Sequence, residues 1–107
     1  MFTRLVTITS RSGKTRELSR MVSEKVLPIL KSQPGFVDEI TLVSSDNPSH
    51  LIAISFWRSR EDAERYSRES FSSITDLISG LVEGTPEVRT FDVEQSTIHK
   101  IATGKAA

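Results

Sequence analysis

Residues 54–66 read ISFWRSREDAERY and contain the only tryptophan and the only tyrosine of the chain, Trp57 and Tyr66. Up to Trp57 the residues are mostly apolar, as at the end of a buried strand. Ser59 followed by Asp62 three positions later is typical of the capping residues that begin a helix. The stretch therefore predicts a strand that passes directly into a helix, with one large aromatic side chain on each side of the junction.

The residues around this junction predict further strands and a second helix. Short segments of alternating or β-branched residues are typical of strands. Such segments are found at residues 2–9, 36–43, 50–57 and 87–94. Between them, apolar residues spaced three and four apart predict helices, one from Leu18 to Ile29 and one that runs on to Val82. We expect the first helix to be kinked at Pro28, which lacks a backbone donor, and the second to end at residues 83–86 (EGTP).

The order of these elements is βαββαβ, which is the order of the ferredoxin-like α+β fold. In that topology the sheet is antiparallel, the first and third strands lie in its middle, and the helices cover one face. The third strand is apolar on both sides, so either the set with Leu51 and Trp57 or the set with Ile54 and Phe56 faces away from the helices. Because either set is too apolar to remain exposed, we expect a second copy of the sheet to cover it, and hence a homodimer.

The composition bounds the class of protein and its partners. The chain has 107 residues, the length of one domain, and its 14 basic and 14 acidic residues cancel. No overall field therefore favours nucleic acid or an anionic membrane as a partner. No apolar run approaches the roughly twenty residues of a membrane helix, and the N-terminus alternates instead of forming the apolar core of a signal peptide. These features predict a cytoplasmic protein with no nucleic-acid or membrane partner.

The end of the chain and its few metal-binding residue types give two further expectations. We expect the domain to cover residues 1–95, and part of the extension at 96–107 to pack on the partner subunit or to extend the fourth strand. The chain has no cysteine and only two histidines, His50 and His99, far apart in the sequence. Because this is not a pattern of metal ligands, we expect no bound metal.

Three short motifs resemble the antibiotic biosynthesis monooxygenase superfamily. They are PGF at residues 34–36, DNP at 46–48 and the run W-x-S-x-E-x-A at 57–63, and the likeness extends over residues 2 to about 95. Members of this family are small ferredoxin-like domains that dimerise into an α/β barrel. They include cofactor-free oxygenases of polycyclic aromatic substrates, haem-degrading oxygenases and many proteins with no assigned reaction.

The resemblance does not carry over a complete catalytic set. The haem-degrading branch uses an asparagine on the first strand, an aromatic residue on the second helix and a histidine further along that helix. At those places this chain has Val6 or Thr7, then Tyr66, then Thr75 or Asp76. Only the aromatic residue is present, so the resemblance disfavours haem degradation by that mechanism. Other members place a histidine early in the second helix, near the position of Tyr66, where this chain has none.

Five residues are candidates for the site. Tyr66 is the residue that we expect to act in catalysis, because a phenol can hydrogen-bond an enol or phenolate substrate inside an apolar pocket. His50, next to a turn, is a second catalytic candidate, as a base that titrates near neutrality. Trp57, Phe56 and Phe71 are candidates for the apolar wall that binds the substrate. The simpler alternatives are that the aromatic residues belong to the core and that His50 is an exposed turn residue.

These residues and the family resemblance together predict a monooxygenase-like protein that acts on a small hydrophobic or aromatic substrate without a cofactor. The alternative is a non-catalytic dimer that binds a ligand or serves in a stress response. A pocket of about 300 Å3 or more that reaches Tyr66 would favour the enzyme. A space already filled by side chains would favour the alternative.

Overall fold

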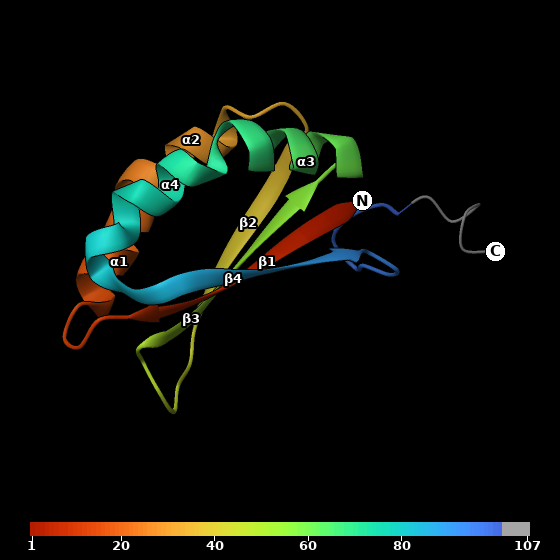
Figure 1. The fold of residues 1–107 in the computed structure, drawn as a ribbon. Helices are drawn as coiled ribbons and strands as arrows, with labels where there is room; N and C mark the ends of the chain where they lie inside the picture. The colour runs from red at the N-terminus through yellow and green to blue at the C-terminus, as the bar shows by residue number, and fades with distance from the viewer. Residues whose placement is uncertain (102–107) are drawn as a thin grey trace.

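The computed structural model describes residues 1–101. In chain order its elements are β1 (Phe2–Ser10), α1 (Thr15–Met21), η1 (Val22–Val26), α2 (Leu27–Lys31), β2 (Phe36–Val43), β3 (His50–Trp57), α3 (Arg60–Glu69), α4 (Phe71–Ile78), η2 (Ser79–Leu81) and β4 (Val82–Asp92). The predicted second helix is thus divided between α3, α4 and η2. The strands form one sheet, and the helices lie together over one of its faces (Figure 1).

The strand order is β2-β3-β1-β4, and every neighbouring pair is antiparallel. The strands β1 and β3 are therefore central, where each is paired along both of its edges. This confirms the predicted ferredoxin-like α+β fold.

Alternation along the central strands decides which residues meet the helices. Arg4 and Val6 of β1 and Ser55 of β3 line a cavity whose opposite wall is formed by helical residues. Because successive side chains of a strand point to opposite faces, Leu51 and Trp57 share the inner side with Ser55. The second set faces away, on what we call the open face: the strand residues Ile52, Ile54 and Phe56. The choice that the sequence left open is thereby resolved.

The predicted kink near Pro28 takes the form of a π-helical turn. The segment η1 directly precedes α2, and Pro28 lies in the first turn of α2. Proline has no N–H to donate, and its ring crowds the carbonyl one turn earlier, so a wider turn before it relieves both conflicts. The chain remains helical from Thr15 to Lys31.

The prediction that residues 83–86 end the second helix is wrong, because β4 already begins at Val82. The pairing of β4 with β1 shifts its register in this segment, where Gly84 has a φ of 66°. An edge strand tolerates such a bulge, and it also tolerates Pro86, because no strand on its outer side needs the missing N–H. The glycine and proline that suggest a helix end are residues of the bulge.

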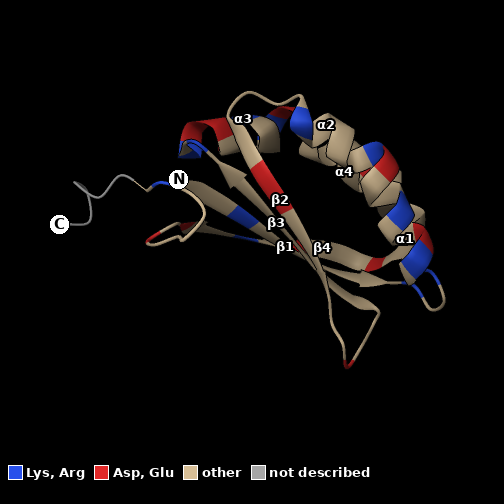
Figure 2. Ribbon diagram, turned by 180° about the vertical axis from the view of Figure 1, so that it is seen from behind, with Lys and Arg blue, Asp and Glu red and all other residues tan. Residues whose placement is uncertain are grey.

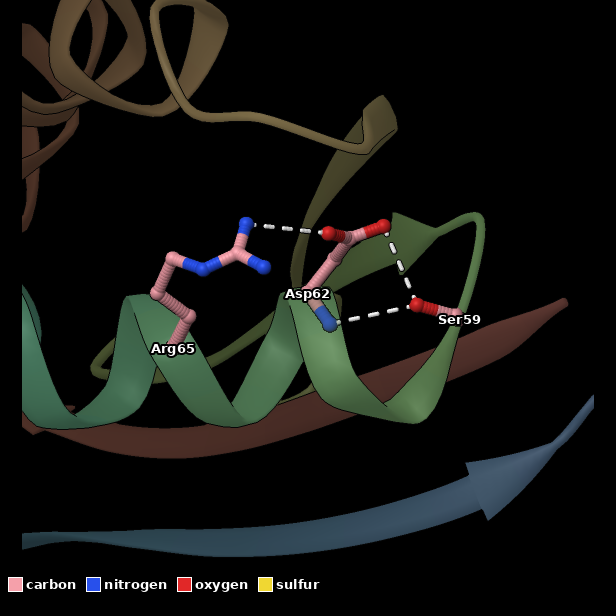
Figure 3. A network of polar contacts seen from close by, with 3 residues as sticks. All are labelled: Ser59, Asp62 and Arg65. Atoms are coloured by element: carbon pink, nitrogen blue, oxygen red, sulfur yellow. Dashed lines mark hydrogen bonds and ion pairs between the residues drawn. The ribbon is translucent and has the colours of Figure 1, made fainter.

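The strand-to-helix junction has the predicted cap. The Asp62 N–H donates to Ser59 Oγ at 3.2 Å, and the Ser59 hydroxyl donates to Asp62 Oδ2 at 3.0 Å. Arg65 Nη1 donates to the second Asp62 oxygen at 3.1 Å, as Figure 3 shows. The carboxylate also lies against Gly35, where φ is 79° and an added Cβ would overlap the Asp62 side chain. The turn before β2 is therefore held against the start of α3.

The end of the described chain lies along the sheet. The Val93 N–H donates to the Met1 carbonyl at 2.9 Å, which continues the pairing of β4. Further on, the His99 ring lies 5.4 Å from the Phe56 ring, and His99 Nε2 lies 3.5 Å from Asp38 Oδ2. This segment thus contacts the open face of its own sheet. Packing of the extension on a partner subunit stays a prediction, and residues 102–107 lie outside the described part of the chain.

Charged residues of both signs are interleaved along the helices (Figure 2). The ion pairs found there are short-range, such as Lys14 with Glu17 and Arg60 with Glu64. Such exposed pairs contribute little to stability. No helix within residues 1–101 has the length and apolar character needed to cross a membrane.

Candidate functional site

An aromatic cluster connects the end of β3 with the helices. The Tyr66 ring stacks on the Trp57 ring with 4.9 Å between centroids, and Phe71 meets Tyr66 edge-on at 6.1 Å. Trp57 is 0% exposed, and its Nε1–H donates to Ser55 Oγ at 2.9 Å. Trp57 is therefore a core residue that fixes the ring of Tyr66 from behind, and it does not line the cavity described next.

A cavity of about 60 Å3 lies between the sheet and the helices and reaches Tyr66. Most of its wall is apolar, with contributions from β1, η1 and α4 that include Val6, Val22, Val26, Phe71, Ile74 and Ile78. The polar groups at its wall include Tyr66, Arg4 and Glu39. This is the usual composition of a small-molecule site, an apolar space with a few polar groups that fix orientation.

Arg4 is a buried cation at the wall of this cavity. It is 3% exposed, and its Cζ lies 4.5 Å from the Phe71 centroid and 5.2 Å from the Tyr66 centroid. Its Nε and Nη2 atoms are buried and have no hydrogen-bond partner among residues 1–101. Burial lowers the pKa of Arg4, but a guanidinium stays charged at any physiological pH.

The other two titratable groups of the cavity, Tyr66 and Glu39, have pKa values shifted toward their neutral forms. Burial raises the pKa of Tyr66 to about 12, although the charge of Arg4 opposes the shift. Burial also raises the pKa of Glu39, against the effect of the hydrogen bond that Thr41 donates to it at 2.7 Å. Tyr66 is therefore a hydrogen-bond donor at neutral pH, and Glu39 is a carboxylate with increased affinity for a proton.

The structure brings together two of the five predicted site residues. Tyr66 and Phe71 line the cavity, and Trp57 supports Tyr66 from the core. Phe56 lies on the open face of the sheet, in contact with the tail. His50 is exposed at the start of β3, at the far end of that strand from Trp57. If His50 acts as a base, it therefore does so outside this cavity.

Sequence reasoning missed Arg4 and Glu39. Arg4 had a readable signal, because it lies between Phe2 and Val6 in the inward phase of a strand, where a charged residue is unexpected. Glu39 had none. A register shift after Phe36 lets Phe36 and Glu39 both face the helices, although strict alternation would place them on opposite faces.

The positions suggested by the family resemblance are also occupied by residues of other chemistry. Of the alternatives named there, Val6 and Thr75 line the cavity, whereas Thr7 and Asp76 do not. Within residues 1–101, no group of three or more histidine, aspartate or glutamate side chains is arranged to hold a metal ion.

The chain is similar to a family model and to several solved structures. The model described as antibiotic biosynthesis monooxygenase matches residues 1–70. SnoaB, a cofactor-independent oxygenase from Streptomyces nogalater, is 20% identical with a TM-score of 0.76, over 92% of this chain and 97% of that one. A protein of unknown function from Nitrosomonas europaea is 11% identical with a TM-score of 0.77, over 92% and 94%.

A conserved protein from Methanosarcina mazei is 18% identical with a TM-score of 0.70, over 85% of this chain and 91% of that one. No curated protein matches the chain. At these sequence identities the solved structures show only that the fold is shared, whereas the match to the family model also indicates common ancestry.

Proposed function

Because the chain belongs to the antibiotic biosynthesis monooxygenase family, we propose that it is a cofactor-independent monooxygenase of a small hydrophobic or aromatic substrate. The observation that carries the proposal is the apolar cavity beside Tyr66, whose protonated hydroxyl is a donor in a place shielded from water. The likeness to a cofactor-independent oxygenase at 20% identity supports the same class of reaction.

The reaction proposed is oxidation of an activated CH2 group next to an aromatic ring. Loss of a proton gives a carbanion whose charge spreads onto a ring oxygen, and that carbanion reduces dioxygen. One oxygen atom becomes the new carbonyl, and the other leaves as water, so CH2 and O2 give C=O and H2O. Tyr66 orients the ring oxygen, and Glu39, whose pKa is raised by burial, is the proton acceptor that lines the cavity.

Oxygen uptake over a panel of anthrones, which carry the activated CH2 group, tests this proposal, and quinols, which lack that group, are compared with them. We expect consumption of dioxygen with at least one of the anthrones. Tyr66→Phe removes the donor but keeps the ring, so it should lower kcat on the order of a hundredfold. His50→Ala, outside the cavity, should leave kcat unchanged, and loss of activity in this variant would assign the base role to His50. An unchanged rate in Tyr66→Phe would contradict the role of the hydroxyl.

We also propose that the protein is a homodimer that pairs through the open face and works in the cytoplasm. The apolar residues of that face are half-buried or exposed in the single chain: Leu5, Ile40, Leu42, Ile52, Ile54, Phe56 and Phe91. Apolar surface of this extent is typical of a protein–protein contact. The absence of cysteine is consistent with a reducing compartment.

A second candidate function is a non-catalytic dimer that binds a small ligand or serves in a stress response. The observation that favours it is the cavity volume of about 60 Å3, well below the roughly 300 Å3 typical of ligand sites. An aromatic substrate would have to enlarge this space by moving its helical wall. Binding of an aromatic ligand with no oxygen uptake across the panel would favour this second function.

A further inference from the structure

The cation at the wall of the cavity has no anion in the described chain. None of the ion pairs among residues 1–101 involves Arg4. Glu39 lines the same cavity, but the hydrogen bond that it accepts comes from Thr41. A buried charge without a counter-charge is strongly unfavourable, and proteins rarely keep one. The charge of Arg4 therefore calls for a partner that is not among these residues.

The geometry of the guanidinium indicates which part of it is available. The rings of Phe71 and Tyr66 both lie close to it, with their centroids 4.5 Å and 5.2 Å from Cζ. The two unpartnered atoms, Nε and Nη2, donate in parallel along one edge of the planar group. Two parallel N–H donors match the two oxygens of a carboxylate, and they can also share one oxyanion. The contacts of the guanidinium with aromatic rings are thus made within the protein, whereas its donor edge is left for a ligand.

The surroundings of this edge restrict the rest of the ligand. The wall next to Arg4 consists mainly of apolar side chains, with the Tyr66 hydroxyl as an added donor. Large hydrated anions such as phosphate would find few further donors there. A ligand with a planar apolar body and a single negative charge would match both the apolar wall and the donor edge of Arg4.

We propose that the cavity binds a small aromatic anion whose ionised oxygens pair with Nε and Nη2 of Arg4. This rests on the proposed function, since the ionised substrate of such an oxygenase carries its charge on an oxygen that is conjugated with the reacting carbon. The donor edge is buried and the cavity holds only about 60 Å3, so binding moves part of the helical wall. Arg4 is then the residue that selects the charged form of the substrate.

Matched ligand pairs test the proposal by isothermal titration calorimetry. Benzoate and benzamide have nearly the same shape but differ in charge, as do 4-nitrophenolate at mildly alkaline pH and 4-nitroanisole. We expect at least one anion to bind on the order of tenfold more tightly than its neutral counterpart. A preference in the first pair identifies a carboxylate ligand, and a preference in the second pair alone identifies a phenolate-type ligand.

Variants assign this preference to one side chain. Arg4→Met keeps much of the volume but removes the charge, and it should abolish the preference for the anion. Arg4→Lys keeps the charge without the two parallel donors, so it should retain a reduced preference, and it serves as the test if Arg4→Met does not fold. The control is Arg60→Met, which removes the same charge from a position over the Phe2 ring and should leave the preference intact.

Three results would overturn the proposal: equal affinity for anion and neutral analogue, no binding of either at millimolar concentration, or a preference that survives in Arg4→Met. The first result is also expected if a carboxylate of a partner subunit pairs with Arg4. Oxygen uptake with anthrones but no preference for anions would remove this inference and leave the proposed function standing. A preference that depends on Arg4, with no oxygen uptake, would retain the ligand class and remove the monooxygenase activity.

Discussion

At the scale of single residues, burial and the charge of Arg4 act on the protonation of Tyr66 in opposite directions. Burial of the hydroxyl raises the pKa of Tyr66, and the charge of Arg4 lowers it by less, so the net pKa is about 12. A neutral phenol beside a cation is a donor that also tolerates negative charge on a neighbouring ligand. Stacking on Trp57 fixes the ring, so the hydroxyl is held in place without a large loss of side-chain entropy on binding.

The titration of Tyr66 can be followed alone, because it is the only tyrosine of the chain. Tyrosinate absorbance should show a midpoint near 12 in the folded protein and near 10.0 in denaturant. Since the folded pKa is the higher one, the stability present below pH 10 should be lost between pH 10 and 12, by about 2 to 3 kcal/mol. Arg4→Met should raise the midpoint further. A folded-state midpoint near 10 would contradict the burial of this hydroxyl.

The residue scale also shows where sequence reasoning succeeds and where it fails. Tyr66 and Phe71 were identifiable because aromatic side chains on a helical stripe face the sheet. Arg4 could have been found from its inward phase in β1. Glu39 could not, because the shift that turns it inward depends on how β2 pairs with β3, which one strand does not encode by itself.

At the scale of elements, the junction of β3 and α3 is the part that local sequence specifies best. The Ser59 cap uses only residues within one turn, and it forms as predicted. The π-helical turn before Pro28 and the bulge around Gly84 depend on packing and pairing between distant segments. For that reason the proline gave the position of the first irregularity but not its form. Likewise, the glycine and proline of the bulge are read from the sequence as the end of a helix.

The contact between the turn before β2 and α3 gives a prediction about stability. Gly35→Ala introduces a Cβ at positive φ that overlaps the Asp62 side chain, so it should lower the free energy of unfolding by about 1 to 3 kcal/mol. Gly80→Ala is the matched control, since its Cβ would meet no atom within 4 Å. Urea denaturation measures both variants.

A double variant separates the two causes. Gly35→Ala combined with Asp62→Gly removes the overlap, in which the Asp62 Cβ takes part, but leaves the unfavourable backbone conformation, so the two changes should cost less together than the sum of the single effects. Equal stability of Gly35→Ala and Gly80→Ala would show that the turn is not held against α3.

At the scale of the whole molecule, the two faces of the sheet have different tasks. The inner face carries the cavity with Arg4 and Tyr66, and the open face carries apolar residues that the chain by itself leaves partly uncovered. The His99 segment covers only the part near Phe56. Ile40, 41% exposed, and Leu42, 46% exposed, remain available for a partner.

The proposed dimer can be tested with two substitutions at equal exposure. Ile40 on the open face and Leu77 on α4 are both 41% exposed. Ile40→Glu should convert a dimer into a monomer at micromolar concentration, because it places a charge in the apolar contact. Leu77→Glu should leave the dimer unchanged. Analytical ultracentrifugation distinguishes these outcomes, and a monomeric parent protein would refute the assembly.

The thinness of the sheet has a consequence for how this protein can change by mutation. On β1, Arg4 contributes to the cavity and its neighbour Leu5 to the open face, so a deletion of one codon inside the strand would exchange the two roles for all strand residues on one side of the deletion. Insertions and deletions should therefore be tolerated in hairpins such as residues 44–49 and eliminated within β1 and β3. A library of single-codon deletions, scored for soluble expression, would display that boundary directly.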